Sequence, residues 1–327
     1  TVNLRTGQLQ PHSRNDYLTK ISPVNYDRDA TCPNWAGTVQ AVFKNDLELI
    51  NYFKKCTGYT LTGDIKEQCL MFSYGKGKNG KSTLLETLFY LMGNYSRRIE
   101  TNSLMTKANR SAGSASEDIA KLKGARMILA SEVEDGHRIN ESLIKDLTGG
   151  DTITARHLYS RSFDFQINGK IWMFGNYRPH VRGQDEGIKR RIKMLPFEHT
   201  FTNPDRNMME KLKEESSGIL NWIIQGCLLW QSEGLQEPKT VLQATQDYFE
   251  TNDTIGQFLR EYTEINDTGL ELVKDIYEMY ADQNKGSYVV SKRLFIEDLR
   301  ERGFTTLRKT GNKMYIIGLT LFKEDVY

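Results

Sequence analysis

The sequence contains few cysteines, and their spacing excludes the sites that cysteine clusters build. Four occur in 327 residues, far apart and without a CxxC pair: Cys32, Cys56, Cys69 and Cys227. Sulfur-ligated zinc sites and the disulfide frameworks of small secreted domains need closely spaced or paired cysteines. We therefore expect reduced thiols in a cytoplasmic protein.

The sequence also lacks a long apolar run and a strong excess of charge. The longest apolar run, ILNWIIQGCLLW at residues 219–230, is too short to span a bilayer, and no signal peptide opens the chain. The formal net charge is only +2, so any basic surface for nucleic acid must be local. With 38% apolar residues and no repeats, the composition predicts ordinary globular domains without a membrane contact.

The chain divides into three regions, which we interpret as domains. Residues 1–66 are turn-rich and then helical, with Asn45 or Asp46 able to cap a second helix. Residues 239–327 read as three helices followed by a β-hairpin, with the helices at 242–263, 269–282 and 291–302. This order is typical of a winged helix-turn-helix, a fold that binds DNA or protein.

Residues 67–238 alternate short apolar strands with helices. The strands are expected at 68–74, 125–132 and 170–176, the helices at 81–93 and 139–150, and a hairpin at 152–168. Strands that alternate with helices predict an α/β domain whose largely parallel sheet carries helices on both faces.

Three glycines and three lysines crowd into the segment YGKGKNGKSTL at residues 74–84. Gly75, Gly80, Lys81 and Ser82 satisfy the pattern G-x-x-x-x-G-K-[ST], with a predicted strand before it and a helix after it. In such a loop the backbone N–H groups surround the β-phosphate, Lys81 reaches the β- and γ-phosphates, and Ser82 binds Mg²⁺. A flexible basic linker is the alternative, but it does not explain the flanking apolar runs.

An acidic group near the γ-phosphate distinguishes nucleotide hydrolases from other proteins with a phosphate loop. The segment RMILASEVED places Glu132 at the tip of a predicted strand, with Glu134 two residues later. We expect Glu132, or secondly Glu134, to activate water; solvated turn acids are the alternative. The GTPase signature N-K-x-D and a kinase lid are both absent, which favours a motor-type ATPase.

Two further strand ends carry polar residues suited to hydrolysis. Asn176 ends the predicted strand KIWMFGN, where it can orient the attacking water, and Arg190 and Arg191 begin another strand. An arginine donated to the nucleotide of a neighbouring subunit stabilises the charge that develops on the transferred phosphoryl group, and it requires a ring. Each of these residues is also compatible with a structural role.

The segments GKGKNGKST, ARMILASEVE, LIKDLTGGDTITARHLY, IWMFGNYRP and DEGIKRRIKMLPF together resemble the superfamily-three helicases. They are most similar to phage, plasmid and mobile-element primase-helicases related to the poxvirus helicase-primase, and the resemblance covers roughly residues 1–235. It implies an AAA+-like ATPase that forms hexameric rings and moves along single-stranded DNA, typically 3′ to 5′.

The resemblance also implies roles for individual residues. It assigns ATP and Mg²⁺ to the loop, Glu132 to the second acidic motif and metal, Asn176 to a γ-phosphate sensor, and Arg190 or Arg191 to the finger. The loop residues are Gly75, Lys76, Gly77, Lys78, Asn79, Gly80, Lys81, Ser82 and Thr83. Lys76 and Lys78 can equally form a solvated face. The strand tip reads Ser131–Glu132 where many relatives carry two acids, so Ser131 or water can replace one metal contact.

In such rings, the hairpin before the sensor strand contacts DNA in the central channel. The suitable residues between Lys145 and Phe165 are cations for phosphates and an aromatic for sugar or base: Lys145, Arg156, His157, Tyr159 and Arg161. An ordinary surface hairpin is the alternative. No primase signature is visible, so priming would belong to another segment or another chain.

The sequence therefore predicts an ATP-dependent replicative DNA helicase of a phage, plasmid or mobile element, in the cytoplasm of a bacterial host cell. Its expected partners are single-stranded and forked DNA, further copies of itself and a primase or other replication protein. Two alternatives stay open: an origin-binding initiator that uses ATP as an assembly switch, and a non-helicase ATPase switch whose winged helix binds protein. Acidic residues within SKRLFIEDLRERG weaken the initiator interpretation.

Overall fold

The structure is a computed structural model that describes residues 1–106, 117–131, 136–182, 185–285, 289–309, 311 and 313–322. It contains two compact units, Thr1–Tyr248 and Phe249–Tyr327. Each unit has its own hydrophobic core.

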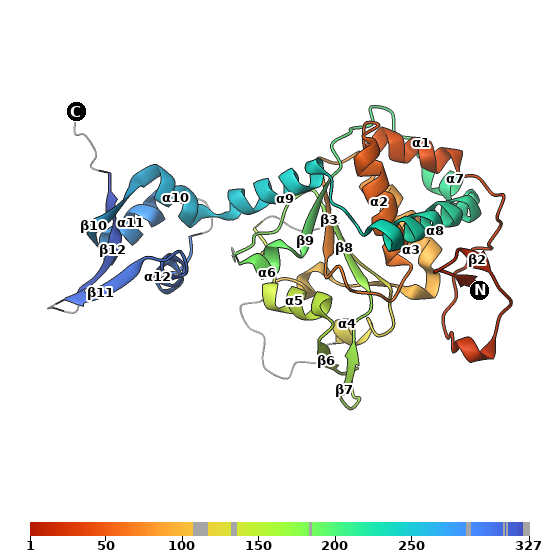
Figure 1. The fold of residues 1–327 in the computed structure, drawn as a ribbon, viewed down its shortest axis with the longest axis horizontal. Coiled ribbons are helices and arrows are strands. Elements are labelled where there is room, and N and C mark those ends of the chain that lie inside the picture. Colours follow the sequence, from red (N-terminus) through yellow and green to blue (C-terminus); the bar gives the residue numbers. More distant parts are fainter. Residues whose placement is uncertain are drawn as a thin grey trace. The chain divides into compact units, whose positions relative to one another are not determined.

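A five-stranded parallel sheet lies at the centre of the first unit (Figure 1). Its strands, in spatial order, are β4 (Ser96–Arg98), β5 (Met127–Ser131), β8 (Lys170–Gly175), β3 (Leu70–Tyr74) and β9 (Ile192–Pro196). In the middle of the sheet, Tyr74 of β3 pairs with Gly175 of β8 and with Pro196 of β9. The carboxyl ends of these three strands therefore meet at one edge. The expected parallel α/β sheet is confirmed.

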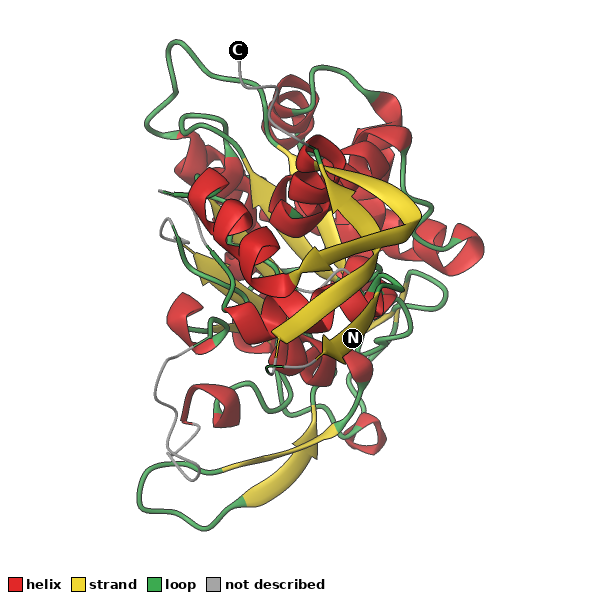
Figure 2. Ribbon diagram, turned by 90° about the vertical axis from the view of Figure 1, so that its left-hand side faces the viewer, coloured by secondary structure: helices red, strands yellow, loops and turns green. Residues whose placement is uncertain are grey.

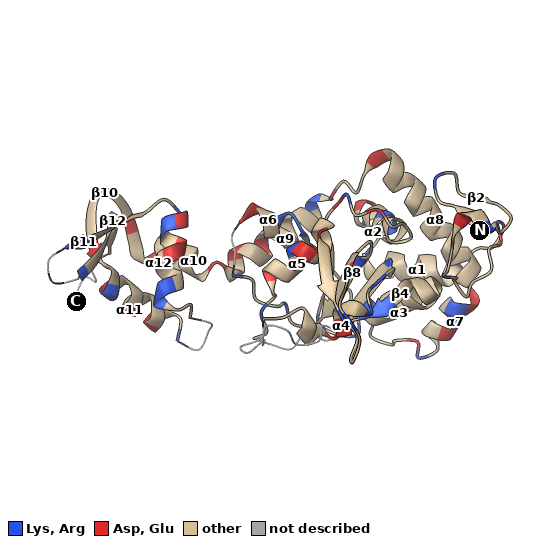
Figure 3. Cartoon of the chain, turned by 90° about the horizontal axis from the view of Figure 1, so that it is seen from below, with Lys and Arg blue, Asp and Glu red and all other residues tan. Residues whose placement is uncertain are grey.

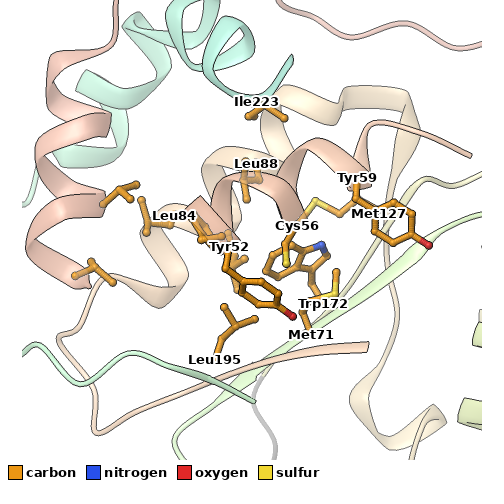
Figure 4. Close-up of a cluster of buried hydrophobic side chains, with 14 of the residues drawn as sticks. Tyr52, Cys56, Tyr59, Met71, Leu84, Leu88, Met127, Trp172, Leu195 and Ile223 are labelled. Carbon is orange, nitrogen blue, oxygen red and sulfur yellow. The ribbon is translucent and has the colours of Figure 1, made fainter. Parts of the chain in front are cut away.

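Both faces of the sheet are buried, as the apolar strands require. One face packs on α1 (Pro33–Val42), α2 (Leu47–Thr60), α3 (Lys81–Met92) and α8 (Ser216–Glu233). Figure 4 shows Met71, Met127 and Trp172 of the strands against Leu84, Leu88 and Ile223 of α3 and α8. Leu70 and Phe72 alternate with Met71 along β3 and are equally buried, so the other face is covered too.

The N-terminal helices belong to the same core as the sheet. Trp35, Tyr52 and Phe53 are fully buried together with the strand residues, so residues 1–66 do not form a separate compact unit. Asp46 caps α2 by accepting a hydrogen bond from the Leu49 amide at 3.0 Å, which settles the choice between the two expected caps. A Cβ at Gly58 of α2 would come within 2.0 Å of the backbone of α8, so these helices pack at a distance that only glycine permits.

Short elements complete the first unit. They are β1 (Val2–Asn3), β2 (Gln8–Leu9), α4 (Glu117–Ala120), α5 (Glu141–Gly149), β6 (Thr152–Ala155), β7 (Phe163–Gln166), α6 (Glu186–Lys189) and α7 (Met208–Glu214), with 3₁₀ turns at Arg14–Asp16, Gly93–Tyr95 and Thr101–Ser103. The antiparallel pair β6–β7 is the expected hairpin. It extends away from the sheet at the bottom of both ribbon views (Figure 1 and Figure 2).

The boundary between the units lies between Tyr248 and Phe249, within helix α9 (Lys239–Asn252). This is ten residues later than the boundary expected at 238/239. Val241 and Tyr248 are buried in the first unit, where the Tyr248 hydroxyl donates to the carbonyl of Pro179 at 2.6 Å. This packing draws the first part of α9 into the first unit.

The second unit differs from the expected three helices and hairpin. Its elements are α10 (Thr254–Tyr262), β10 (Thr263–Leu272), α11 (Val273–Gln283), α12 (Lys292–Glu301), β11 (Thr305–Lys309) and β12 (Lys313–Leu321). The single helix expected at 242–263 is wrong, because Asp253 interrupts it and caps α10 through the Gly256 amide at 2.9 Å. The helix expected from 269 begins at Val273, because β10 pairs with β12 in a three-stranded antiparallel sheet.

The four cysteines are free, as expected. Among the described residues, no helix is both long and apolar enough to cross a membrane. Within the same residues, no group of three or more histidine, cysteine, aspartate or glutamate side chains could hold a metal ion.

Candidate active site

The predicted phosphate loop joins β3 directly to α3, so the strand and the helix that the motif needs are both present. The loop turns sharply: Gly77, Lys78 and Gly80 have φ of 61°, 49° and 81°. A Cβ at Gly75 would lie 2.2 Å from the Phe197 carbonyl oxygen, so only glycine fits there. The Asn79 side chain is buried and donates to the same carbonyl at 2.9 Å, which fixes the loop to the end of β9.

Lys81 is the first residue of α3, and its side chain folds back across the loop. Its Nζ donates to the Gly75 carbonyl at 2.7 Å and to Asn79 Oδ1 at 3.0 Å. The side chain is buried, and burial lowers the pKa of its ammonium group to about 8. The two acceptors are neutral, so the lysine charge is hydrogen-bonded but not balanced by a carboxylate in these contacts.

Asn176 lies beside this lysine, as the strand-end argument predicts. Because β8 pairs with β3 in parallel, the residue after Gly175 is next to the start of the loop. Asn176 Oδ1 is 3.5 Å from Lys81 Nζ. The structure thus brings together two residues that are 95 positions apart in the sequence.

The other loop residues are more exposed. Ser82 is exposed in the first turn of α3, and the Lys76 and Lys78 side chains are also exposed. The Lys78 carbonyl accepts a hydrogen bond from the Phe201 amide at 2.9 Å. A ligand in front of the loop could therefore reach Ser82 without displacing core residues.

The predicted acids lie outside the described residues. Strand β5 adjoins β8 and ends at Ser131, whose carbonyl accepts a hydrogen bond from the Thr101 hydroxyl. Glu132 and Glu134 follow in the sequence, within the 132–135 segment that the structure does not describe. Their role therefore rests on the sequence argument alone.

The structure separates the two candidate finger arginines. Arg191 is only 8% exposed, and its guanidinium donates to Thr148 Oγ1 at 3.1 Å and to the Gly187 carbonyl at 2.7 Å. Arg190 is exposed. Both precede β9 and lie at the amino edge of the sheet, opposite the phosphate loop of the same chain. Arg190 alone is free to reach another molecule without breaking buried hydrogen bonds.

The loop of the β6–β7 hairpin presents the predicted DNA-binding residues. Arg156, His157, Tyr159 and Arg161 are all exposed, and Tyr159 is fully exposed with a left-handed φ of 59°. Glu117 braces the base of this loop, since it accepts a hydrogen bond from the Leu158 amide at 2.9 Å and lies 3.2 Å from His157 Nδ1. The hydrogen bonds from Leu158 and His157 lower the pKa of Glu117.

Lys145 does not belong to this hairpin. It lies in α5, and its Nζ is 3.0 Å from both carboxylate oxygens of Asp185, the residue that caps α6. Lys145 therefore connects α5 to the start of α6 through an ion pair, which is a structural contact within this unit.

The sequence argument did not identify Arg178 as a site residue. This exposed arginine lies two positions after Asn176, and its guanidinium carbon is 4.1 Å from the centre of the Tyr74 ring, directly before the phosphate loop. Its position two residues after Asn176 is the sequence feature that could have identified Arg178 as a site residue. The ring contact itself depends on the pairing of β3 with β8.

Two family models match the chain. The model described as "Family of unknown function (DUF5906)" matches residues 73–191, and the model "D5 N terminal like" matches residues 1–44. The first covers the phosphate loop, Asn176 and both arginines.

The chain is similar to viral proteins and to solved structures over most of its length. A "Putative helicase" of Acanthamoeba polyphaga mimivirus is 28% identical over 80% of this chain and 29% of its own length. A "Putative primase" of African swine fever virus is 23% identical over 75% of this chain and 28% of its own length. The apo structure of the NrS-1 C-terminal region has a TM-score of 0.54 at 13% identity, covering 91% of this chain and 78% of that one.

The chain therefore spans less than a third of the length of these viral relatives. The relatives are viral, so they give no support to the expected bacterial host. The predicted resemblance to primase-helicases is confirmed: this chain is similar to viral proteins named helicases and primases, and its N-terminal segment matches the D5-type model.

Proposed function

We propose that the chain is the ATPase and helicase portion of a viral or mobile-element replication protein. The observation that carries the proposal is Lys81, buried across the phosphate loop and 3.5 Å from Asn176 at the carboxyl edge of a parallel sheet. In α/β proteins, ligands bind outside the carboxyl ends of the strands. The similarity to viral proteins named helicases and primases supports a role in DNA replication.

The residues present fit a nucleoside triphosphate and Mg²⁺. Open space lies beside Gly77, where a Cβ would meet no other atom within 4 Å, and the N-terminus of α3 favours an anion. Lys81 would exchange its contacts with Gly75 and Asn79 for the β- and γ-phosphates, while Ser82 and Glu132 would hold Mg²⁺. When bound, the metal neutralises charge on the phosphate oxygens.

Hydrolysis needs a positioned water and a cation at the transferred phosphoryl group. We assign the orientation of this water to Asn176 and Glu132, and we assign the cation to Arg190, the exposed arginine that a neighbouring subunit could supply. Such a contact in trans requires a neighbouring copy of the chain, and we propose that the copies form the AAA+-like hexameric ring that the resemblance implies.

The β6–β7 hairpin is the proposed motor contact with single-stranded DNA. Exposed Tyr159 offers a face for stacking, and exposed Arg161 offers charge for phosphates. The order helix, strand, two helices and two strands in the second unit supports a winged helix as its fold. Movement in the 3′ to 5′ direction is part of the proposal.

Hydrolysis of ATP by the intact chain, with and without single-stranded DNA, tests the proposal. We expect DNA to stimulate hydrolysis, and Lys81→Ala to abolish both rates. Lys76→Ala is the matched control: it removes an exposed lysine from the same loop and should keep most of the activity. Hydrolysis that DNA does not change would favour an ATPase switch over a motor.

A further inference from the structure

In the second unit, acidic residues are absent from one segment that carries basic residues. Acidic residues occur throughout α10, β10, α11 and α12, but none occurs between Gly303 and Phe322, which include β11 and β12. The cations of that segment are Arg308, Lys309 and Lys313, and all three are exposed. The tip of the β11–β12 hairpin is therefore a local cationic surface on a unit that carries many acids elsewhere.

Helix α12 and its C-cap carry cations too: Lys292 Nζ lies 5.9 Å from the centre of the Tyr277 ring, and the three arginines contact polar groups of the unit. Arg302 contacts Asp253 and Asp298 in partly buried ion pairs, and Arg293 contacts Glu297 at 3.0 Å. Arg300 donates to Thr306 Oγ1 at 2.7 Å. Figure 3 shows acidic and basic residues side by side on this helix. A phosphate backbone next to α12 would meet carboxylates as well as cations.

The hairpin tip is different because its cations face one another. Lys309 of β11 pairs directly with Lys313 of β12, and Arg308 pairs with Met314 next to them. Like charges opposite each other on an antiparallel pair destabilise it. Among the described residues, no carboxylate forms an ion pair with any of the three. Lys309 Nζ also lies 5.2 Å from the centre of the Tyr315 ring, so an aromatic adjoins the cations.

We propose that Arg308, Lys309 and Lys313 bind the phosphate backbone of DNA, and that the second unit contacts nucleic acid through this tip rather than through α12. The ligand supplies the anions that the opposed lysines lack. Binding of this kind is independent of base sequence and falls steeply with salt. It is additional to the β6–β7 motor contact and independent of ATP, so it does not rest on the proposed hydrolysis.

The test is equilibrium binding of the full chain to a fluorescent duplex of arbitrary sequence, without nucleotide, over a series of salt concentrations. The variant is Arg308→Gln/Lys309→Gln/Lys313→Gln. We expect weaker binding, with a slope of log K against log salt that is smaller by about 2 to 3, since each phosphate contact contributes about 0.9.

The matched control is Arg260→Gln/Lys274→Gln/Lys285→Gln, which removes the same charge from exposed positions in α10, in α11 and just after α11. It should keep the intact salt slope. Equal slopes for both triple variants would overturn the proposal, and so would equally tight binding of a polyglutamate peptide through the same three cations. ATP hydrolysis without DNA should be the same in the intact chain and in both variants. An intact chain that does not hydrolyse ATP would contradict the proposed function, but the DNA-binding comparison would still test this proposal.

Discussion

Lys81 is a buried cation whose hydrogen-bond acceptors are a backbone carbonyl and asparagine side chains. Burial without a charged partner lowers its pKa to about 8, while phosphates bound beside it would raise the pKa again. Nucleotide binding is then coupled to proton uptake wherever the free lysine is neutral. Above pH 8 the affinity therefore falls as pH rises, and between pH 7 and pH 8 it changes little because the free lysine is already mostly protonated.

We predict that nucleotide affinity is nearly flat from pH 7 to 8 and then decreases by up to tenfold per pH unit, because the phosphates select the protonated lysine. Calorimetric titration at pH 9 in buffers of different ionisation enthalpy should reveal the proton taken up. Lys76→Ala should give the same profile. Constant affinity up to pH 9.5 without proton uptake would show that Lys81 stays charged in the free loop.

At the scale of elements, the sequence predicted those helices and strands whose position depends on the residues within them. Strand β3, helix α3, strand β8 and the β6–β7 hairpin follow from apolar runs, glycine stops and period-two alternation. The break before α10 does not, because Asp253 is fixed there by the distant Arg302 as well as by its own cap. Strand β10 likewise depends on pairing with β12, some fifty residues away.

For the candidate site too, the sequence predicted the features that depend on local patterns and missed those that depend on packing. Lys81 and Asn176 carry a motif and a strand-end position, and both lie where these indicate. The burial of Arg191 and the ion pair of Lys145 result from packing between separate elements, which a single sequence does not encode in any local pattern.

Arg302 should be a main support of the second unit. Its guanidinium joins Asp253, the cap of α10, to Asp298 of α12, and its side chain is only 24% exposed. Arg302→Ala leaves two partly buried carboxylates without their cation, so we predict a loss of about 2 to 4 kcal/mol. Hydrogen exchange of the α10 and α12 amides measures this loss for the unit itself.

Arg293→Ala is the control for that measurement. Arg293 also pairs with an acid of α12, but its side chain is 85% exposed, so its removal should cost less than about 0.5 kcal/mol. Equal protection in the two variants would mean that the Arg302 pairs do not hold α10 and α12 together. Amides of the first unit should exchange as in the intact chain in both cases.

At the scale of the whole molecule, the proposed ring places Lys81 and Arg190 of different subunits at one nucleotide. Lys81→Ala and Arg190→Ala should each remove hydrolysis. A mixture of the two should regain part of it, because some interfaces then join an intact loop to an intact arginine. The hydrolysis rate is measured against mixing ratio.

Arg191→Ala serves as the comparison in the mixing experiment. Since Arg191 is held by Thr148 and Gly187 inside its own chain, its loss should lower the stability of the first unit. A mixture with Lys81→Ala that regains as much activity as the Arg190→Ala mixture would identify Arg191 as the donated residue. If neither mixture exceeds the sum of its components, neither Arg190 nor Arg191 acts in trans.

The central claim is that hydrolysis at the phosphate loop moves the β6–β7 hairpin along DNA. Strand displacement on forked duplexes with a 3′ or a 5′ tail tests it most directly, comparing the intact chain with Lys81→Ala and Arg161→Ala. The account predicts unwinding of the 3′-tailed fork by the intact chain, none by Lys81→Ala, and reduced unwinding with retained basal hydrolysis in Arg161→Ala. An assembled, ATP-hydrolysing chain that opens neither fork would contradict it.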